Sequence, residues 1–271
     1  MSPDTSNLNW YLQVSGNSTG LPLLWLHGFM GSSDDWRTLV NEHFREYCNI
    51  LVDLPGHGHT YLPENLEYPE LLERLKQQLS LAGYQSFVPI GYSMGGRFAL
   101  HLQQHFPESI PALVGLSTAP GLKTAQERQQ RINSDTELMH RLDRVGFTTF
   151  LKEWYELPLF QSIYKNDKQI FWLMTTRSDN DPEQLSRALQ HLGSGSLPSL
   201  WGSLPDMELP ILLLSGALDQ KYSELNHEMA TQLPHAQHQI LDGGDHAFHL
   251  EKPLETAHLI KQFLRETIEG E

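Results

Sequence analysis

A serine flanked by glycines is the residue most suited to chemistry. Residues 91–96 read Gly-Tyr-Ser-Met-Gly-Gly, so Ser93 lies in a G-x-S-x-G motif between an apolar run typical of a buried strand and a stretch with helical spacing. On such a strand-to-helix turn the backbone is strained, the hydroxyl stands above the sheet, and larger residues at the glycines would collide with neighbours. The segment lacks the spacing of a P-loop or a dinucleotide site, which disfavours phosphate binding.

A serine hydroxyl is nearly inert at pH 7, so it needs a base and a group that orients the base. His246 and Asp219 are the candidates, because each follows an apolar run at the expected carboxyl end of a strand, where open α/β sheets bind ligands. His249 is an alternative base. Asp242 and Asp245 are alternative carboxylates, but they lie in the loop of His246 and suit turn formation.

Two further loops leave strands at the same predicted edge. In residues 27–31, His-Gly-Phe-Met-Gly, the backbone N–H of Phe29 could join that of Met94 to form an oxyanion hole, although a plain turn would have similar letters. His57 and His59 occur in the second loop, after Asp53. No third ligand follows at usable spacing, so we interpret this loop as a structural turn and predict no metal site.

Alternation of strands and helices predicts the fold class. Helical spacing at 69–82, 94–106, 224–233 and 253–268 separates short apolar runs at 21–26, 49–53, 86–91, 112–116, 211–215 and 238–241. This pattern indicates an α/β fold with a mostly parallel sheet flanked by helices. Strand signals vanish between about 121 and 205. We therefore expect a core made of residues 1–120 and 206–271, with a helical cap at 121–205.

Composition limits the partners and the compartment. The chain has 271 residues, a formal net charge of −14 and one cysteine, Cys48. Its acidity argues against nucleic acid or an anionic membrane as the main partner. With no leader-like start, no apolar run of about 18 residues and no possible internal disulfide, the sequence favours a cytoplasmic protein. The sequence does not indicate an oligomeric state.

Arginine is concentrated in the predicted cap. Residues 121–205 hold six of the eleven arginines and have balanced charge, so the rest of the chain carries the whole deficit. Arginines facing a pocket would attract a small anion even in an acidic protein. The alternative is ordinary surface pairing, such as Glu127 with Arg131 at i,i+4 spacing.

These segments together resemble the α/β-hydrolase superfamily from end to end, including its order of Ser, Asp and His. Within it, the chain is similar to the family of 2-succinyl-6-hydroxy-2,4-cyclohexadiene-1-carboxylate synthases of menaquinone and phylloquinone biosynthesis. The resemblance is carried by residues 26–31, 53–58, 91–97, 127–131, 154–155, 158–160 and 176–178. The first two segments are widespread among hydrolases. Arg97, the cap arginines and Trp154 are the residues that point to this family within the superfamily.

The resemblance implies a lyase that needs no cofactor and eliminates pyruvate from a small tricarboxylate. Ser93 would remove a ring proton with help from His246, while Asp219 orients the imidazole. The oxyanion would lie against the N–H groups of Phe29 and Met94. The residues implied in substrate binding are Tyr92, Arg97, Arg128, Arg131, Trp154 and Arg177.

One departure from the family and two other functions stay open. The family commonly has Gly before the histidine, where this chain has Asp245, which places a carboxylate next to the base in the sequence and bears on the pH optimum. A hydrolase of an ester or a carbon–carbon bond could use the same residues, because one fold hosts many chemistries. A protein that only binds a ligand is the third possibility, which the complete Ser93, Asp219 and His246 set disfavours.

Overall fold

The computed structural model describes residues 8–270 and contains a seven-stranded sheet in the order β1-β3-β2-β4-β5-β6-β7. All neighbouring strands are parallel except β1, which pairs antiparallel with β3. The strands are β1 (Leu12–Gly16), β2 (Pro22–Leu26), β3 (Cys48–Val52), β4 (Val88–Tyr92), β5 (Leu113–Leu116), β6 (Ile211–Gly216) and β7 (Ala236–Leu241). The predicted α/β class is confirmed, and β1 is an addition that the sequence analysis missed.

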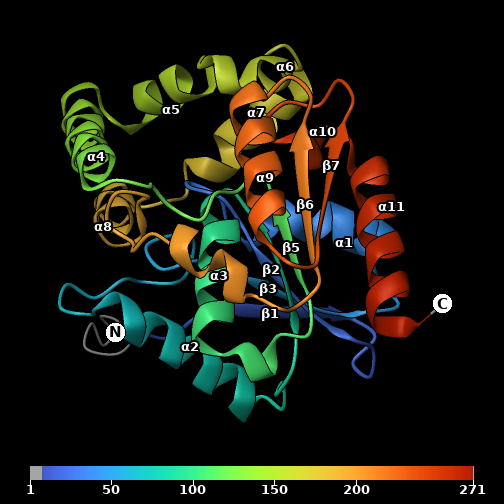
Figure 1. Ribbon diagram of the computed structural model, residues 1–271. Coiled ribbons are helices and arrows are strands. Elements are labelled where there is room, and N and C mark those ends of the chain that lie inside the picture. The colour runs from blue at the N-terminus through green and yellow to red at the C-terminus, as the bar shows by residue number, and fades with distance from the viewer. Residues whose placement is uncertain (1–7, 271) are drawn as a thin grey trace.

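Helices cover both faces of this sheet (Figure 1). One face packs against α2 (Tyr68–Leu81), α3 (Met94–His105) and α9 (Gln220–Gln232). The other packs against α1 (Arg37–His43) and α11 (Pro253–Leu264), and α10 (Phe248–Glu251) lies next to α11. Strand β2 shows why the apolar runs are continuous, because Leu24 belongs to the core on one face and Trp25 to the core on the other.

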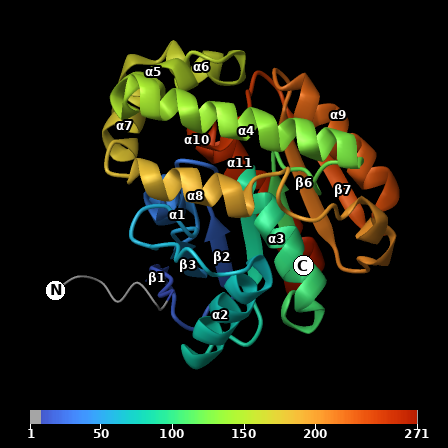
Figure 2. The ribbon, with the colours of Figure 1, turned by 90° about the vertical axis from the view of Figure 1, so that its left-hand side faces the viewer.

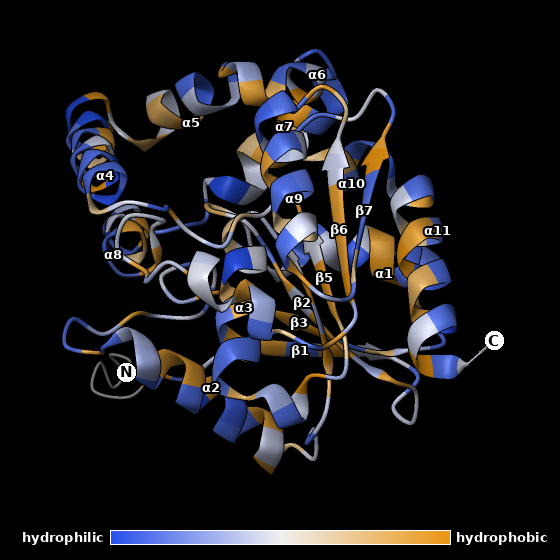
Figure 3. Ribbon diagram, in the orientation of Figure 1, coloured by the Kyte–Doolittle hydropathy of each residue, from blue (hydrophilic) through white to orange (hydrophobic). Residues whose placement is uncertain are grey.

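The chain between β5 and β6 is helical and lies over the carboxyl ends of the strands, toward which the arrows of β6 and β7 point in Figure 1. We call these helices the cap: α4 (Ala125–Val145), α5 (Phe147–Tyr155), α6 (Gln161–Tyr164), α7 (Asp167–Arg177) and α8 (Pro182–Leu192). Figure 2 shows α4 and α8 crossing in front of α3 and the strand ends. In Figure 3 the strands are largely hydrophobic and α4 is largely hydrophilic.

Short irregular helices complete the chain. They are the 3-10 helices η1 (Ser33–Trp36), η2 (Pro107–Ser109), η3 (Pro158–Phe160) and η4 (Trp201–Asp206), and the π-helix η5 (Arg265–Glu269). No helix within residues 8–270 is long and apolar enough to cross a bilayer.

Candidate active site

Ser93 lies on a strained turn between β4 and α3. Its φ of 51° and ψ of −108° fall where residues with a side chain are uncommon. The turn is held by the Ser93 N–H, which donates to the carbonyl of Leu116 at 2.8 Å, and by the Thr118 hydroxyl, which donates to the carbonyl of Ser93 at 3.0 Å. Strand β5 therefore fixes the backbone that presents the hydroxyl.

The glycines of the motif are required by close packing. A Cβ on Gly95 would come within 2.2 Å of the carbonyl oxygen of Leu26, and one on Gly91 within 2.4 Å of the carbonyl oxygen of Gly95. Each contact is far below van der Waals distance and involves backbone. The start of α3 can therefore pack this tightly on β2 and β4 only with glycine at these positions.

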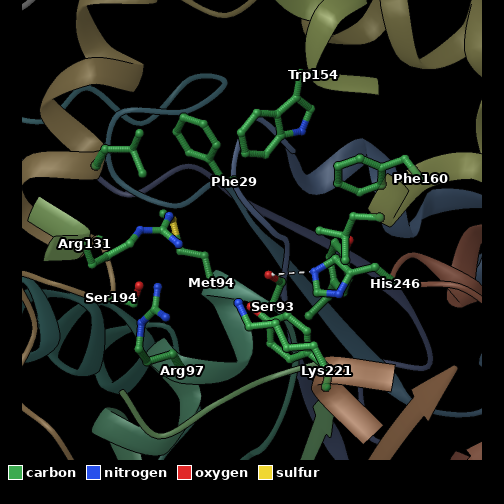
Figure 4. A pocket seen from close by; sticks show the side chains of 15 residues that line it. Phe29, Ser93, Met94, Arg97, Arg131, Trp154, Phe160, Ser194, Lys221 and His246 are labelled. Carbon is green, nitrogen blue, oxygen red and sulfur yellow. Dashed lines mark hydrogen bonds between the residues drawn. The ribbon is translucent and has the colours of Figure 1, made fainter. Parts of the chain in front are cut away.

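Three side chains from different loops meet in hydrogen-bonding order. His246 Nε2 lies 3.1 Å from Ser93 Oγ (Figure 4). On the other side of the ring, His246 Nδ1 lies 2.7 Å from Asp219 Oδ2. Asp219 is also the N-cap of α9, since its Oδ1 accepts from the Tyr222 N–H at 3.3 Å. Asp219 and His246 are both buried. This arrangement lets the imidazole accept the proton of the serine hydroxyl while the carboxylate fixes the ring.

The alternative base and carboxylates occupy other places. His249 is buried between Trp36 and Tyr92, with ring centroids 4.9 and 4.3 Å away, and does not line the pocket around Ser93. Burial lowers the pKa of His249 to about 3, so it is neutral. Asp245 accepts hydrogen bonds from Ser162 of α6 and from the N–H of Ala247.

Two backbone N–H groups beside Ser93 have no acceptor in the part of the chain that the structure describes. They belong to Phe29, in the loop after β2, and to Met94, the first residue of α3. Met30, next to Phe29, has a φ of 62°, and its carbonyl accepts from Asn180 at 2.9 Å. Free donors next to a reactive hydroxyl are what an oxyanion needs.

The serine opens into a cavity of about 160 Å³ between the sheet edge and the cap. Its walls combine aromatic rings with cations and include no Asp or Glu, although the protein is strongly acidic. The lining residues are Phe29, Tyr92, Ser93, Met94, Arg97, Arg131, Trp154, Leu159, Phe160, Leu189, Gly193, Ser194, Lys221, Tyr222 and His246.

Arg97 is a buried cation without a counter-ion. It lies one turn after Ser93 on α3, is 8% exposed, and donates only to the carbonyl of Leu192, at 3.3 Å, among the described residues. Its Nε is buried without any partner. Burial lowers the pKa of Arg97 to about 10, so it is still charged at pH 7. Such a charge is costly unless an anion joins it.

Arg131 reaches the same cavity from the cap. It lies on α4, and its Nε donates to Asp135 at 2.8 Å, which leaves the rest of the guanidinium directed into the pocket. The guanidinium groups of Arg97 and Arg131 face each other in Figure 4. An anion between them would be attracted by both.

Two cap arginines are not part of this cavity, contrary to the expectation from the sequence. Arg128 donates to the carbonyls of Gly195 and Ser196, and so ties α4 to the loop after α8. Arg177 forms a buried bidentate pair with Asp35, at 2.6 and 2.8 Å. Burial alone would lower its pKa, but the Asp35 carboxylate raises it. Its charge is thus already neutralised between cap and core.

Tyr92 and Trp154 both line the pocket. Burial raises the pKa of Tyr92 well above its ordinary value, so its hydroxyl stays protonated. The indole of Trp154, on α5, meets the ring of Phe29 edge-on with centroids 5.6 Å apart. A cap residue therefore contacts the loop that carries the free N–H of Phe29.

Sequence reasoning missed several lining residues, of which Lys221 and Phe160 are the most informative. Lys221 follows Asp219 by two positions, but that spacing alone does not distinguish it from a surface lysine. The ring of Phe160 packs against that of His246 with centroids 6.0 Å apart. Only the folded cap brings Phe160 to the base.

The histidines after β3 form a structural loop. His57 is buried against the rings of His27 and Phe29, and His59 contacts Asp53 at 3.1 Å. Burial lowers the pKa of His57 to about 3, which keeps it neutral. No group of three or more His, Cys, Asp or Glu residues within 8–270 could hold a metal ion.

The fold and the serine site together define a class of protein. The model of the alpha/beta hydrolase fold matches residues 22–253, and the chain belongs to this family. Proteins named 2-succinyl-6-hydroxy-2,4-cyclohexadiene-1-carboxylate synthase are its relatives in Escherichia coli O1:K1, at 30% identity over 94% of this chain and 98% of that one, and in Serratia proteamaculans, at 28% over 89% and 92%. The resemblance found in the sequence is thus confirmed.

Solved structures agree with this grouping. MenH from S. aureus has a TM-score of 0.89 and 28% identity, covering 95% of this chain and 98% of that chain. An esterase from Thermogutta terrifontis, at 23% identity and a TM-score of 0.82 over 96% and 94% of the two chains, shares the fold.

Proposed function

We propose that this protein is a 2-succinyl-6-hydroxy-2,4-cyclohexadiene-1-carboxylate synthase, a carbon–oxygen lyase that eliminates pyruvate from 2-succinyl-5-enolpyruvyl-6-hydroxy-3-cyclohexene-1-carboxylate. The relatives that carry this name support the assignment. The observation that carries it within the molecule is Arg97, one turn from Ser93. Among the residues that the structure describes, this buried cation has no counter-ion and the pocket around it has no acidic residue. Such a pocket suits a substrate with three carboxylates.

The names of substrate and product define the bond changes. The ring proton at carbon 2, which is acidified by the neighbouring succinyl carbonyl, leaves first and its electrons form an enolate. The electrons then shift through the ring, so that double bonds form at carbons 2 and 4 and the bond from carbon 5 to the enolpyruvyl oxygen breaks. The departing enolate takes a proton and becomes pyruvate. Nothing is oxidised or reduced, and the scheme uses no cofactor.

Ser93 and His246 carry the proton in this scheme. As Ser93 Oγ takes the ring proton, its own proton passes along the 3.1 Å contact to His246 Nε2. Asp219, 2.7 Å from Nδ1, holds the tautomer and stabilises the imidazolium. The imidazolium then supplies the proton that the leaving enolate requires, which restores the resting state.

The N–H groups of Phe29 and Met94 are proposed to bind the enolate oxygen of the succinyl group. Within residues 8–270 neither N–H has another acceptor, which leaves both available, and both residues line the pocket with Ser93. Losing one such donor costs roughly 3 kcal/mol of transition-state stabilisation in comparable sites.

Arg97 and Arg131 are proposed to bind substrate carboxylates, with the Tyr92 hydroxyl as a further donor and the Trp154 ring as an apolar wall. A guanidinium can make two parallel hydrogen bonds to a carboxylate. Arg128 and Arg177 act differently in this proposal, because their contacts to the loop after α8 and to Asp35 position the cap. A cytoplasmic location fits the buried, unpaired Cys48.

The test is an assay of the purified protein with the enolpyruvyl substrate, in which pyruvate and the cyclohexadiene are measured together, and with a neutral aryl ester as control. The proposal predicts equimolar pyruvate and diene, with far slower ester cleavage. Rapid ester cleavage without pyruvate would instead identify a serine hydrolase of the kind that the shared fold also permits.

A further inference from the structure

Lys221 occupies a position in the pocket that the proposed mechanism does not use. It lies in the first turn of α9, two residues after Asp219, and its side chain runs toward Ser93 in Figure 4. Because Asp219 caps the start of α9, it also fixes the position of the Lys221 backbone. Its neighbour Tyr222 packs on the ring of His246, with centroids 4.5 Å apart, so the segment is anchored at the reacting groups.

The ammonium group of Lys221 has no counter-ion among residues 8–270. It forms no ion pair and donates no hydrogen bond there, and its nearest charge-stabilising contact is the ring of Tyr222 at 5.5 Å. Lys123 and Lys261 form ion pairs with Glu228 and Glu46, and the other lysines in this part of the chain that lack one, such as Lys152, do not line the pocket. A lysine facing a reactive serine without an acid nearby is available to a ligand anion.

With Lys221, the pocket holds three cations and no acid. The three differ in setting. Arg97 is buried at the base of the pocket, Arg131 shares its charge with Asp135, and Lys221 is exposed at the mouth. A substrate with three carboxylates would supply one for each cation. The burial and the existing partner of each cation indicate which carboxylate it binds.

We propose that Lys221 binds the carboxylate of the enolpyruvyl group, which departs as pyruvate. This inference rests on the proposed function. The leaving group has to reach solvent. Lys221 is exposed whereas Arg97 is buried, and Arg131, the other cation that reaches solvent, already donates to Asp135. At the moment the carbon–oxygen bond breaks, the departing fragment carries a carboxylate and a developing enolate, so a nearby cation stabilises it. An ammonium is a compact point charge on a flexible stem, which can follow the fragment outward.

The test uses Lys221→Met, which keeps the length of the stem and removes the charge. Three quantities are measured: kcat/KM for pyruvate release, inhibition by added pyruvate, and inhibition by the cyclohexadiene product, which lacks the enolpyruvyl group. We expect kcat/KM to fall at least about tenfold, equal to ~1.4 kcal/mol. Inhibition by pyruvate should weaken about as much, while inhibition by the diene should change less than about twofold.

Lys152→Met is the matched control, since Lys152 is exposed on α5 and does not line the pocket. Lys221→Arg should retain most of the activity. If diene inhibition weakens as much as pyruvate inhibition, Lys221 holds another carboxylate and the assignment is wrong. Unchanged kinetics would also overturn it. If the parent protein releases no pyruvate from the substrate, the proposed function is wrong. In that case, direct titration of the parent and of Lys221→Met with pyruvate still tests the binding site.

Discussion

At the residue scale, the main result is the contrast between two kinds of buried arginine. Arg177 and Asp35 form a closed pair that neutralises both charges at the junction of cap and core. Within residues 8–270, Arg97 contacts a carbonyl but no carboxylate. An uncompensated buried charge destabilises the ligand-free protein. We therefore propose that the function of Arg97 is to bind an anionic group of the ligand.

Replacing Arg97 tests this interpretation. We expect Arg97→Ala to lower kcat/KM for pyruvate release at least ~10²-fold, about 2.7 kcal/mol, because the carboxylate contact and the orientation it gives are lost. Steady-state kinetics on the enolpyruvyl substrate provide the measurement. Arg144→Ala is the control, since Arg144 pairs with Glu137 on the surface of α4. Near-unchanged turnover in Arg97→Ala would remove the main support for the lyase.

The proposed role of Ser93 as the base has an equally direct consequence. Ser93→Ala leaves His246 and Asp219 paired but removes the atom that contacts the ring proton, so we expect a loss of more than about 10³-fold. Ser178→Ala, which alters only an exposed hydroxyl bonded to the carbonyl of Thr175, should have full activity. Activity within tenfold of the parent in Ser93→Ala would mean that another group takes the proton.

The sequence predicted these residues unequally, for physical reasons. Ser93, Asp219 and His246 follow buried strands, and parallel strands bring their carboxyl ends to one edge, so their meeting could be foreseen. Arg128 and Arg177 lie on cap helices. Which face of each helix points toward the pocket depends on packing that cannot be inferred from the sequence. Lys221 reads as an ordinary surface lysine until the pocket is built around it.

At the element scale, the turn between β4 and α3 combines strain with close packing. Strands β2 to β6 were predicted to within two residues at either end because nearly all of their residues are buried. Strand β7 was predicted equally closely, although only Leu241 in it is buried. β1 was missed because its residues alternate between exposed and half-buried. Helix α9 begins at Gln220, four residues before the predicted start, since Asp219 caps it. A capping contact extends a helix beyond its apolar pattern.

Gly95→Ala should destabilise the protein through this turn. The new Cβ would lie 2.2 Å from the carbonyl oxygen of Leu26 and 2.5 Å from that of His27, so α3 or β2 must shift. We expect a loss of roughly 3 kcal/mol in the free energy of unfolding, measured by urea denaturation. Gly202→Ala, where a Cβ meets nothing within 4 Å, should change it by less than about 0.5 kcal/mol. Equal stabilities would contradict the packing argument.

A carboxyl pair links the cap to the loop of the base. The Ser162 hydroxyl of α6 contacts both Asp245 and Glu251, at 3.1 Å from the latter. The Ser162 hydroxyl has one proton and can donate it to only one of the two carboxylates. The second contact is a hydrogen bond only if the other carboxyl group carries a proton and donates it. In agreement, burial and the Asp245 carboxylate raise the pKa of Glu251 from 4.5 to about 7.

This pair predicts a pH dependence of stability. The folded protein keeps the Glu251 proton up to about pH 7, whereas an unfolded glutamate loses it near pH 4.5, so the free energy of unfolding falls as pH rises between these values. Glu251→Gln should reduce that fall, as measured by Tm at pH 5 and pH 8. Glu255→Gln, on the exposed side of α11, should follow the parent. An identical pH profile for Glu251→Gln would show that the proton resides elsewhere.

At the scale of the whole molecule, charge is divided between surface and pocket. The chain carries −14 overall, yet the cavity over Ser93 presents Arg97, Arg131 and Lys221 without an acid. The cap supplies Arg131, and the core supplies the other two. In our proposal, the complete anion site therefore forms only where the helices between β5 and β6 lie over the strand ends, so this insertion would determine what the common fold binds.

The central claim is that this site removes a proton from ring carbon 2 and then expels pyruvate. The most direct measurement compares pyruvate release from substrate bearing hydrogen or deuterium at carbon 2, in the parent and in Arg97→Ala, where weakened binding of the transition state makes proton removal limiting. If Ser93 removes this proton, release from the deuterated substrate is slower, most clearly in Arg97→Ala. Equal rates from both substrates in that variant would contradict it.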